Sequence, residues 1–103
     1  MMLVNTDYIS GKDLETLGMV KGNVVQSRNF GHDFMAAIKT LVGGEITGYT
    51  EMLNQARQIA IKRMVDEAEQ MGADAIINIR YASASVMQGA AEVIAYGTAV
   101  RYL

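Results

Sequence analysis

Residues 49–72, "YTEMLNQARQIAIKRMVDEAEQMG", repeat apolar side chains at intervals of three and four residues. This spacing predicts an amphipathic α-helix, which Thr47 can cap and Gly72 can end. One wide apolar face contains Met52, Leu53, Ala56, Ala60, Met64, Ala68 and Met71. The opposite, polar face contains Asn54, Gln55, Gln58, Lys62, Asp66 and Glu69. We therefore expect a long helix with one face packed and the other in water.

After this helix the period changes to two, which is typical of β-strands. The segments 75–86 and 91–102 are rich in β-branched and aromatic residues, and the short "MQGA" between them predicts a hairpin. Strict alternation in the first strand puts Ala75, Ile77, Ile79 and Tyr81 on one face, and Ile76, Asn78, Arg80, Ala82 and Val86 on the other. In the second strand it puts Val93, Ala95 and Ala99 on one face, and Ile94, Tyr96, Val100 and Tyr102 on the other.

Before the long helix we predict short strands at residues 2–6 and 19–26, joined by the connector "SGKDLETLG". Phe30, Phe34, Ile38 and Leu41 recur at helical spacing, and this predicts a first helix that Gly43 ends. The expected fold is α+β: an antiparallel sheet with helices packed on one face. At 103 residues the chain forms a single domain, residues 1–103.

The composition excludes several classes of function. Nine basic and 11 acidic side chains give no basic surface for nucleic acid or an anionic membrane. No apolar run approaches the ~20 residues of a membrane span, and the N-terminus has no signal-peptide pattern, so we expect a cytoplasmic protein. The absence of cysteine excludes disulfides and thiolate chemistry.

Charged residues make up 19% of the chain, against about 25% in an average domain. A small domain has proportionately more surface to cover, so this composition indicates that partner subunits cover some apolar side chains. We therefore expect a homo-oligomer.

The segment "GGEITGYT", residues 43–50, has the glycine spacing of a phosphate-binding loop, with Tyr49 in place of the lysine. Such a loop follows a buried strand, whereas the preceding "FMAAIKTLV" has helical periodicity. Glu45 would also repel a phosphate. The pattern favours a connection between two helices over a nucleotide site.

Several pieces of the chain resemble the YbjQ family of small bacterial and archaeal proteins, which are described as heavy-metal-binding. They are "VGG" at 42–44, "GYTEMLNQARQIAIKRM" at 48–64, "EAEQMGADAIINIRY" at 67–81 and "YGTAVR" at 96–101, with a weaker match at 9–25. The resemblance implies an α+β subunit, similar to a dodecin subunit, in a ring-like homopentamer with strand pairing between neighbours. It carries over no catalytic residue. This sequence has Glu45 where the family commonly has an arginine, and it lacks cysteine.

His32 and Asp33 are the only adjacent pair of residues typical of a metal site. Zinc needs three or four ligands, so rotational symmetry or distant carboxylates would have to complete the site for a divalent or heavy-metal ion. The alternative is a structural role in the first turn of the first helix. The methionines could bind Cu(I), but their place on the apolar helix face favours core packing.

Arg57 projects into the apolar arc of the long helix, and no carboxylate lies three or four residues away. A buried guanidinium needs a partner, so we expect one from another strand, another subunit or a bound anion. Glu67, also within the arc, can pair with Arg63. Tyr49 and Arg80 are further candidates for ligand or interface contacts, although cross-strand packing also accounts for the tyrosines.

The sequence contains no recognisable catalytic triad or pair of carboxylates, so we expect no enzyme. The function it favours is a homo-oligomer, a pentamer by resemblance, that binds a small ligand or metal ion. The alternative is a structural or protein-interaction scaffold without a bound ligand.

Overall fold

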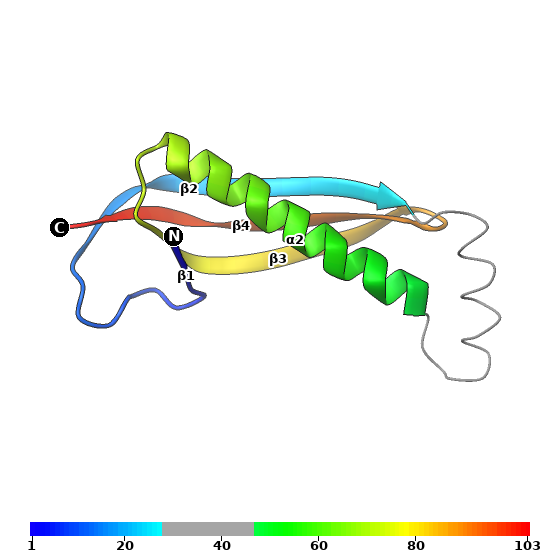
Figure 1. Ribbon diagram of the computed structural model, residues 1–103, viewed down its shortest axis with the longest axis horizontal. Helices are drawn as coiled ribbons and strands as arrows, with labels where there is room; N and C mark the ends of the chain where they lie inside the picture. The colour runs from blue at the N-terminus through cyan, green and yellow to red at the C-terminus, as the bar shows by residue number, and fades with distance from the viewer. Residues whose placement is uncertain (28–46) are drawn as a thin grey trace.

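The computed structural model describes residues 1–27 and 47–103. In this part of the chain a long helix lies diagonally across one face of a four-stranded sheet (Figure 1). The elements are β1 (Met2–Leu3), β2 (Leu14–Ser27), α2 (Thr47–Gln70), β3 (Ala75–Met87) and β4 (Ala90–Tyr102). The expected α+β class is confirmed, and so are the long helix and the hairpin that follows it. The helix expected over residues 30–41 lies outside the described residues.

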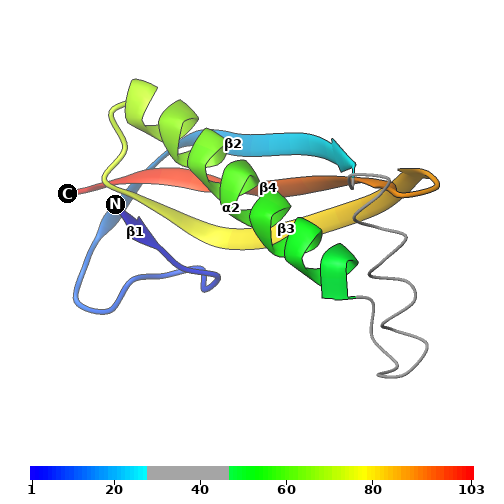
Figure 2. The ribbon, with the colours of Figure 1, turned by 45° about the vertical axis from the view of Figure 1, so that its right-hand side comes forward.

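The sheet is mixed, with strand order β1-β3-β4-β2. β4 pairs antiparallel with both β3 and β2, whereas β1 pairs parallel with β3. The expectation of a purely antiparallel sheet is therefore wrong. A tight hairpin forces two strands to be antiparallel, and β1 is not joined to β3 in this way, so nearness in sequence does not set its direction. In two views, β1 and the segment after it lie beside β3 on the side away from β4 (Figures 1 and 2).

β1 and β2 differ most from the sequence prediction, whereas the predicted bounds of β3 and β4 are within one residue of those observed. β2 begins at Leu14, within the expected connector. The sequence pattern missed this first part of the strand because a register shift between Thr16 and Gly18 interrupts the alternation. Gly18 has a φ of 150°, which a residue with a side chain rarely adopts. β1 ends at Leu3, although the chain continues beside β3 after this point.

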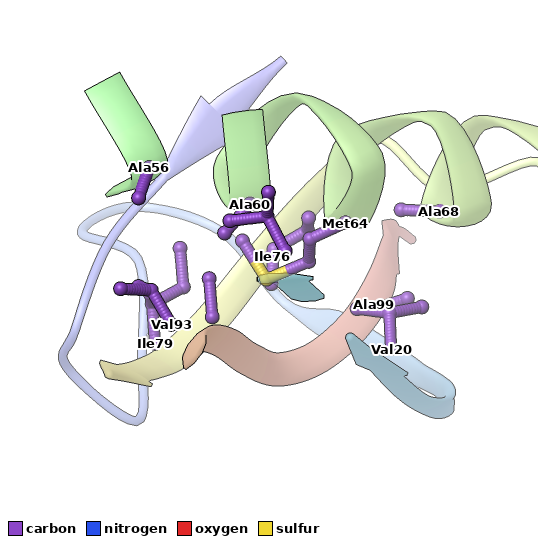
Figure 3. Close-up of a cluster of buried hydrophobic side chains, with 11 residues drawn as sticks. Val20, Ala56, Ala60, Met64, Ala68, Ile76, Ile79, Val93 and Ala99 are labelled. Atoms are coloured by element: carbon purple, nitrogen blue, oxygen red, sulfur yellow. The ribbon is translucent and has the colours of Figure 1, made fainter. Parts of the chain in front are cut away.

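The main core lies between α2 and the sheet. The predicted apolar helix face is confirmed: Met52, Ala56, Ala60, Met64 and Ala68 are buried, and Leu53 and Met71 are partly buried against them. In Figure 3 the labelled alanines and Met64 of the helix face labelled side chains of the sheet. These sheet residues are Val20, Ile76, Ile79, Val93 and Ala99. The prediction that the helix methionines pack in the core is thus confirmed for Met52 and Met64.

A smaller core lies on the opposite face, at one end of the sheet. Ile9 packs there with Ala75, Ile77 and Val100. The loop after β1 thus covers this end of the face. Further along, Met19 and Val25 of β2 remain 76% and 60% exposed.

At Gly22 of β2 the strand backbone lies directly against the helix backbone. A Cβ atom at this position would overlap the carbonyl oxygen of Ala60 and the backbone nitrogen of Met64, and would lie 2.8 Å from the Cβ of Arg63. The helix backbone therefore rests directly on the strand. Because only glycine fits, this contact fixes both the height and the lateral position of α2.

Two side chains of α2 hold the strand on either side of this contact. Arg63 Nη1 donates a hydrogen bond to the carbonyl oxygen of Asn23 at 2.7 Å, and the backbone N–H of Lys21 donates to Glu67 Oε1 at 3.3 Å. We expected Glu67 to pair with Arg63, but each reaches the backbone of β2 instead. Since β2 is an edge strand, these contacts satisfy backbone groups that no neighbouring strand reaches in the described structure.

Substitution of Gly22 by alanine should lower the free energy of unfolding by about 3 kcal/mol, the upper part of the usual range for overpacking, because the overlapped atoms belong to the backbone and cannot rotate away. Chemical denaturation would measure the loss. Asn23→Ala is the matched control: its side chain is exposed, and the change should stay within about 0.5 kcal/mol. Equal stability of the two variants would contradict the proposed close contact.

Candidate functional site

A β-bulge interrupts β3 near its middle. Ile77 pairs with Thr98 and Arg80 pairs with Tyr96, so two residues of β3, Asn78 and Ile79, lie opposite the single residue Gly97. Asn78 has a φ of 54°, in the left-handed region that asparagine tolerates better than most residues. The bulge therefore rests on a residue type suited to this backbone conformation.

Gly97 completes the bulge from the side of β4. A Cβ atom there would lie 2.8 Å from Ile76 Cγ2 and 2.8 Å from the carbonyl oxygen of Ile77. Such contacts are tighter than side chains accept, so the bulged strand needs glycine opposite it.

The extra residue reverses the faces of β3 from this point onward. Ile79 joins Ile76 in the core beneath α2, whereas Ile77 belongs to the core on the other face. Strict alternation put Ile79 with Ile77, and this prediction is wrong because a bulge shifts the alternation by one residue. Tyr81 now lies opposite the buried Ala95, on the helix side.

The segment after β1 is joined to the bulge by backbone hydrogen bonds. The N–H of Val4 donates to the carbonyl oxygen of Ile76 at 3.0 Å, and that of Ile79 donates to the carbonyl oxygen of Val4 at 3.1 Å. The N–H of Asn78 donates to the carbonyl oxygen of Thr6 at 2.9 Å. The left-handed residue thus directs its own N–H to the N-terminal segment and fixes it beside the bulge.

Arg80 adds a side-chain contact to the same segment. Its Nη1 donates to the carbonyl oxygens of Asn5 at 2.9 Å and Ile79 at 3.0 Å. One end of the guanidinium is therefore held in place by main-chain atoms.

A cavity of about 750 Å³, widely open to solvent, lies between the N-terminal segment, α2 and the bulged part of β3. Its lining is largely apolar, with one charged side chain among the described residues. The lining residues are Leu3, Val4, Asn5, Thr6, Ile61, Ile79, Arg80 and Tyr81. We refer to this space as the bulge cavity.

Of the residues singled out from the sequence, Arg80 lines the bulge cavity, but Arg57 and Tyr49 are not among the described residues that line it. Arg57 is exposed and donates from Nη1 to Asn54 Oδ1 at 2.9 Å. The expected burial of Arg57 is wrong, because its long side chain carries the charge from the edge of the apolar arc into solvent. Its predicted role in a ligand or interface contact remains a prediction. Tyr49 is half-buried in the first turn of α2.

Sequence reasoning missed the N-terminal part of the site. Residues 2–6 were expected only as a strand, and their approach to the bulge depends on contacts with residues far along the chain, such as that between Asn5 and Arg80, 75 positions apart. One local signal was present: asparagine is disfavoured within strands, and Asn78 interrupts the run "IINIR". It marks the bulge but not what packs against it.

The described residues do not form a metal site. Within residues 1–27 and 47–103, no group of three or more histidine, cysteine, aspartate or glutamate side chains is placed to hold a metal ion. The predicted pair His32 and Asp33 lies outside this part of the chain. The same part contains no helix with the length and hydropathy to cross a membrane.

Comparison with known proteins identifies the family. A family model with the description "YbjQ_1: Putative heavy-metal-binding" matches residues 1–103. The chain belongs to the YbjQ family. Similar proteins include the UPF0145 proteins of Clostridium novyi and Alkaliphilus metalliredigens, each 63% identical over 103 residues and covering all of both chains. The UPF0145 protein of Thermotoga maritima is 56% identical over 102 residues, which cover 98% of this chain and 96% of the relative.

A solved structure supports the fold of this YbjQ-family chain. A crystal structure from Pediococcus pentosaceus, described as a protein of unknown function in the DUF74 family, aligns with a TM-score of 0.66 at 13% identity. The alignment covers 100% of this chain and 98% of the other. At this identity the likeness concerns the fold alone.

Asn78→Val should lower the free energy of unfolding by about 1–2 kcal/mol, since a β-branched residue resists the left-handed conformation. The matched variant Asn78→Gly accepts a positive φ and should stay within about 1 kcal/mol of the original protein. Chemical denaturation of both variants makes the comparison. A valine variant as stable as the glycine variant would show that the bulge does not depend on this conformation.

Proposed function

We propose that this protein is a non-enzymatic homo-oligomer that binds a small organic ligand in the bulge cavity. The resemblance to the YbjQ family implies a ring of five chains, which we adopt as part of the proposal. The observation that carries the proposal is the cavity itself.

The cavity has the size and chemistry of a small-molecule site. Such sites generally measure about 300–1,000 Å³ and combine an apolar lining with a few polar groups, and a volume of about 750 Å³ falls within this range. Leu3, Val4, Ile61 and Ile79 offer apolar surface, while Asn5, Thr6 and Arg80 offer polar groups.

The sheet edges support assembly of several chains. β1 pairs with β3 only at Ala75 and Ile76, so the part of β3 from residue 80 to 87 has a strand on one side only in the described structure, and every residue in it is exposed. β2 forms the opposite edge, but Glu67 and Arg63 of α2 already bond to Lys21 and Asn23 there, so the β3 edge is the better site for a neighbouring strand. Long unpaired edges are ready sites for strand addition, so pairing between neighbouring chains would satisfy them. The exposed Met19 and Val25 add apolar surface for such contacts.

A metal ion fits the described residues less well than an organic ligand. Arg80 lines the bulge cavity, and its positive charge repels cations; no cluster of acidic or histidine side chains that could hold a metal is found among the described residues. His32 and Asp33 remain the proposed ligands if the protein binds a divalent or heavy-metal ion, with copies from several chains around an axis completing the set.

Native mass spectrometry of untagged protein, purified without chelators, tests assembly and ligand together. We expect a pentamer with additional mass that an organic extraction removes. Elemental analysis of the same sample distinguishes a metal from an organic species. Arg57→Ala serves as a comparison, because loss of assembly in this variant would assign Arg57 to an interface.

The outcomes separate the proposal from its alternative. A monomer at micromolar concentration would contradict the oligomer. A pentamer without additional mass would instead favour a structural or protein-interaction scaffold, which the free sheet edges also suit.

A further inference from the structure

Arg80 brings a positive charge to the lining of the bulge cavity, and within residues 1–27 and 47–103 it has no acidic partner. The described residues place no carboxylate within ion-pair distance of this guanidinium, and both of its hydrogen bonds leave from Nη1 to main-chain oxygens. Nη2 and Nε therefore remain available. Held by one end, the guanidinium presents the geometry that binds a carboxylate through two parallel hydrogen bonds.

The rest of the cavity offers mainly apolar surface. Ile61 of α2 faces this space together with Ile79 and Tyr81 of β3, and Leu3 and Val4 close it from the N-terminal segment. A ligand that satisfies both parts needs an apolar body and one anionic group. Because Arg80 is exposed, the anionic group would lie at the mouth of the cavity.

We propose that the bulge cavity selects small amphipathic carboxylates, with Arg80 binding the carboxylate and the apolar walls holding the rest of the molecule. This inference rests on the proposed ligand-binding function and adds the chemical class of the ligand. Charge complementarity carries it: the apolar walls alone would accept neutral molecules equally well.

A matched pair of fluorescent probes tests this selection. Anilinonaphthalene sulfonate carries a sulfonate that stands in for the carboxylate, and phenylnaphthylamine is the same aromatic body without it. We expect the original protein to bind the anionic probe at least about tenfold more tightly, the difference typical of a hydrogen-bonded charge. Decanoate should displace it at lower concentrations than decanol does, and this competition requires no variant.

Variants locate the effect. Arg80→Met keeps the aliphatic part of the side chain but removes the hydrogen bond to Asn5, so it should weaken binding of the anionic probe about tenfold more than binding of the neutral probe. Arg80→Lys should recover part of this difference. Arg101→Met is the matched control, because Arg101 lies on β4 and faces Glu15 at 4.0 Å rather than the cavity. Ile61→Trp should narrow the cavity and weaken the binding of both probes.

Equal binding of the two probes, unchanged by Arg80→Met, would overturn the selection for anions and leave ligand binding in the cavity standing. An equal loss in Arg80→Met and Arg101→Met would also overturn it, because general surface charge would then account for the preference. If neither probe binds at millimolar concentration, or if Ile61→Trp changes neither, the proposed function fails together with this inference.

Discussion

The contact between Gly22 and the backbone of α2 sets how the helix lies on the sheet in the described part of the chain. A side chain at this position would meet atoms of Ala60 and Met64 that cannot move without breaking the helix. The helix therefore lies closer to β2 than ordinary side-chain packing allows, and Arg63 and Glu67 fix it there through the strand backbone. Because α2 is fixed against β2 in this way and crosses the sheet diagonally, its position also determines which helix residues lie above β3 (Figure 1).

The bulge in β3 shapes the candidate site, the bulge cavity beside α2. Two residues opposite Gly97 turn Ile79 toward the helix and leave the N–H groups of Asn78 and Ile79 for the N-terminal segment. A regular strand would continue its alternation and direct Ile79 to the other face. The cavity thus depends on a local departure from regular structure, held in place by a glycine on one side and by hydrogen bonds on the other.

Much of the fold follows from local sequence, whereas the site does not. The helix face of Ala56, Ala60 and Met64 and the hairpin at Gly89 follow from periodicity and a short turn, which depend only on neighbouring residues. The parallel pairing of β1 and the approach of residues 4–6 to the bulge depend on contacts between opposite ends of the chain. Arg80 was a candidate from the sequence, but its main-chain partners became apparent only in three dimensions. Arg57 was expected to be buried because its Cβ lies on the apolar side of the helix, yet it is exposed. The direction of the Cβ does not determine where the end of a long side chain lies.

Backbone contacts hold two sides of the bulge cavity in place: α2 rests on Gly22, and the N-terminal segment is bonded to the bulge. Burial of apolar surface stabilises a protein by roughly 25 cal/mol for each Å² removed from water. An apolar lining in contact with water lacks this stabilisation, which favours closure of the cavity. Here α2 cannot move inward, since its backbone already rests on Gly22, and the N-terminal segment is tied to the bulge by main-chain hydrogen bonds. Closure by the described residues would require breaking one of these contacts. An apolar occupant with an anionic end would cover the lining and engage the free side of Arg80 without disturbing either, and this is the physical reason to regard the cavity as a binding site.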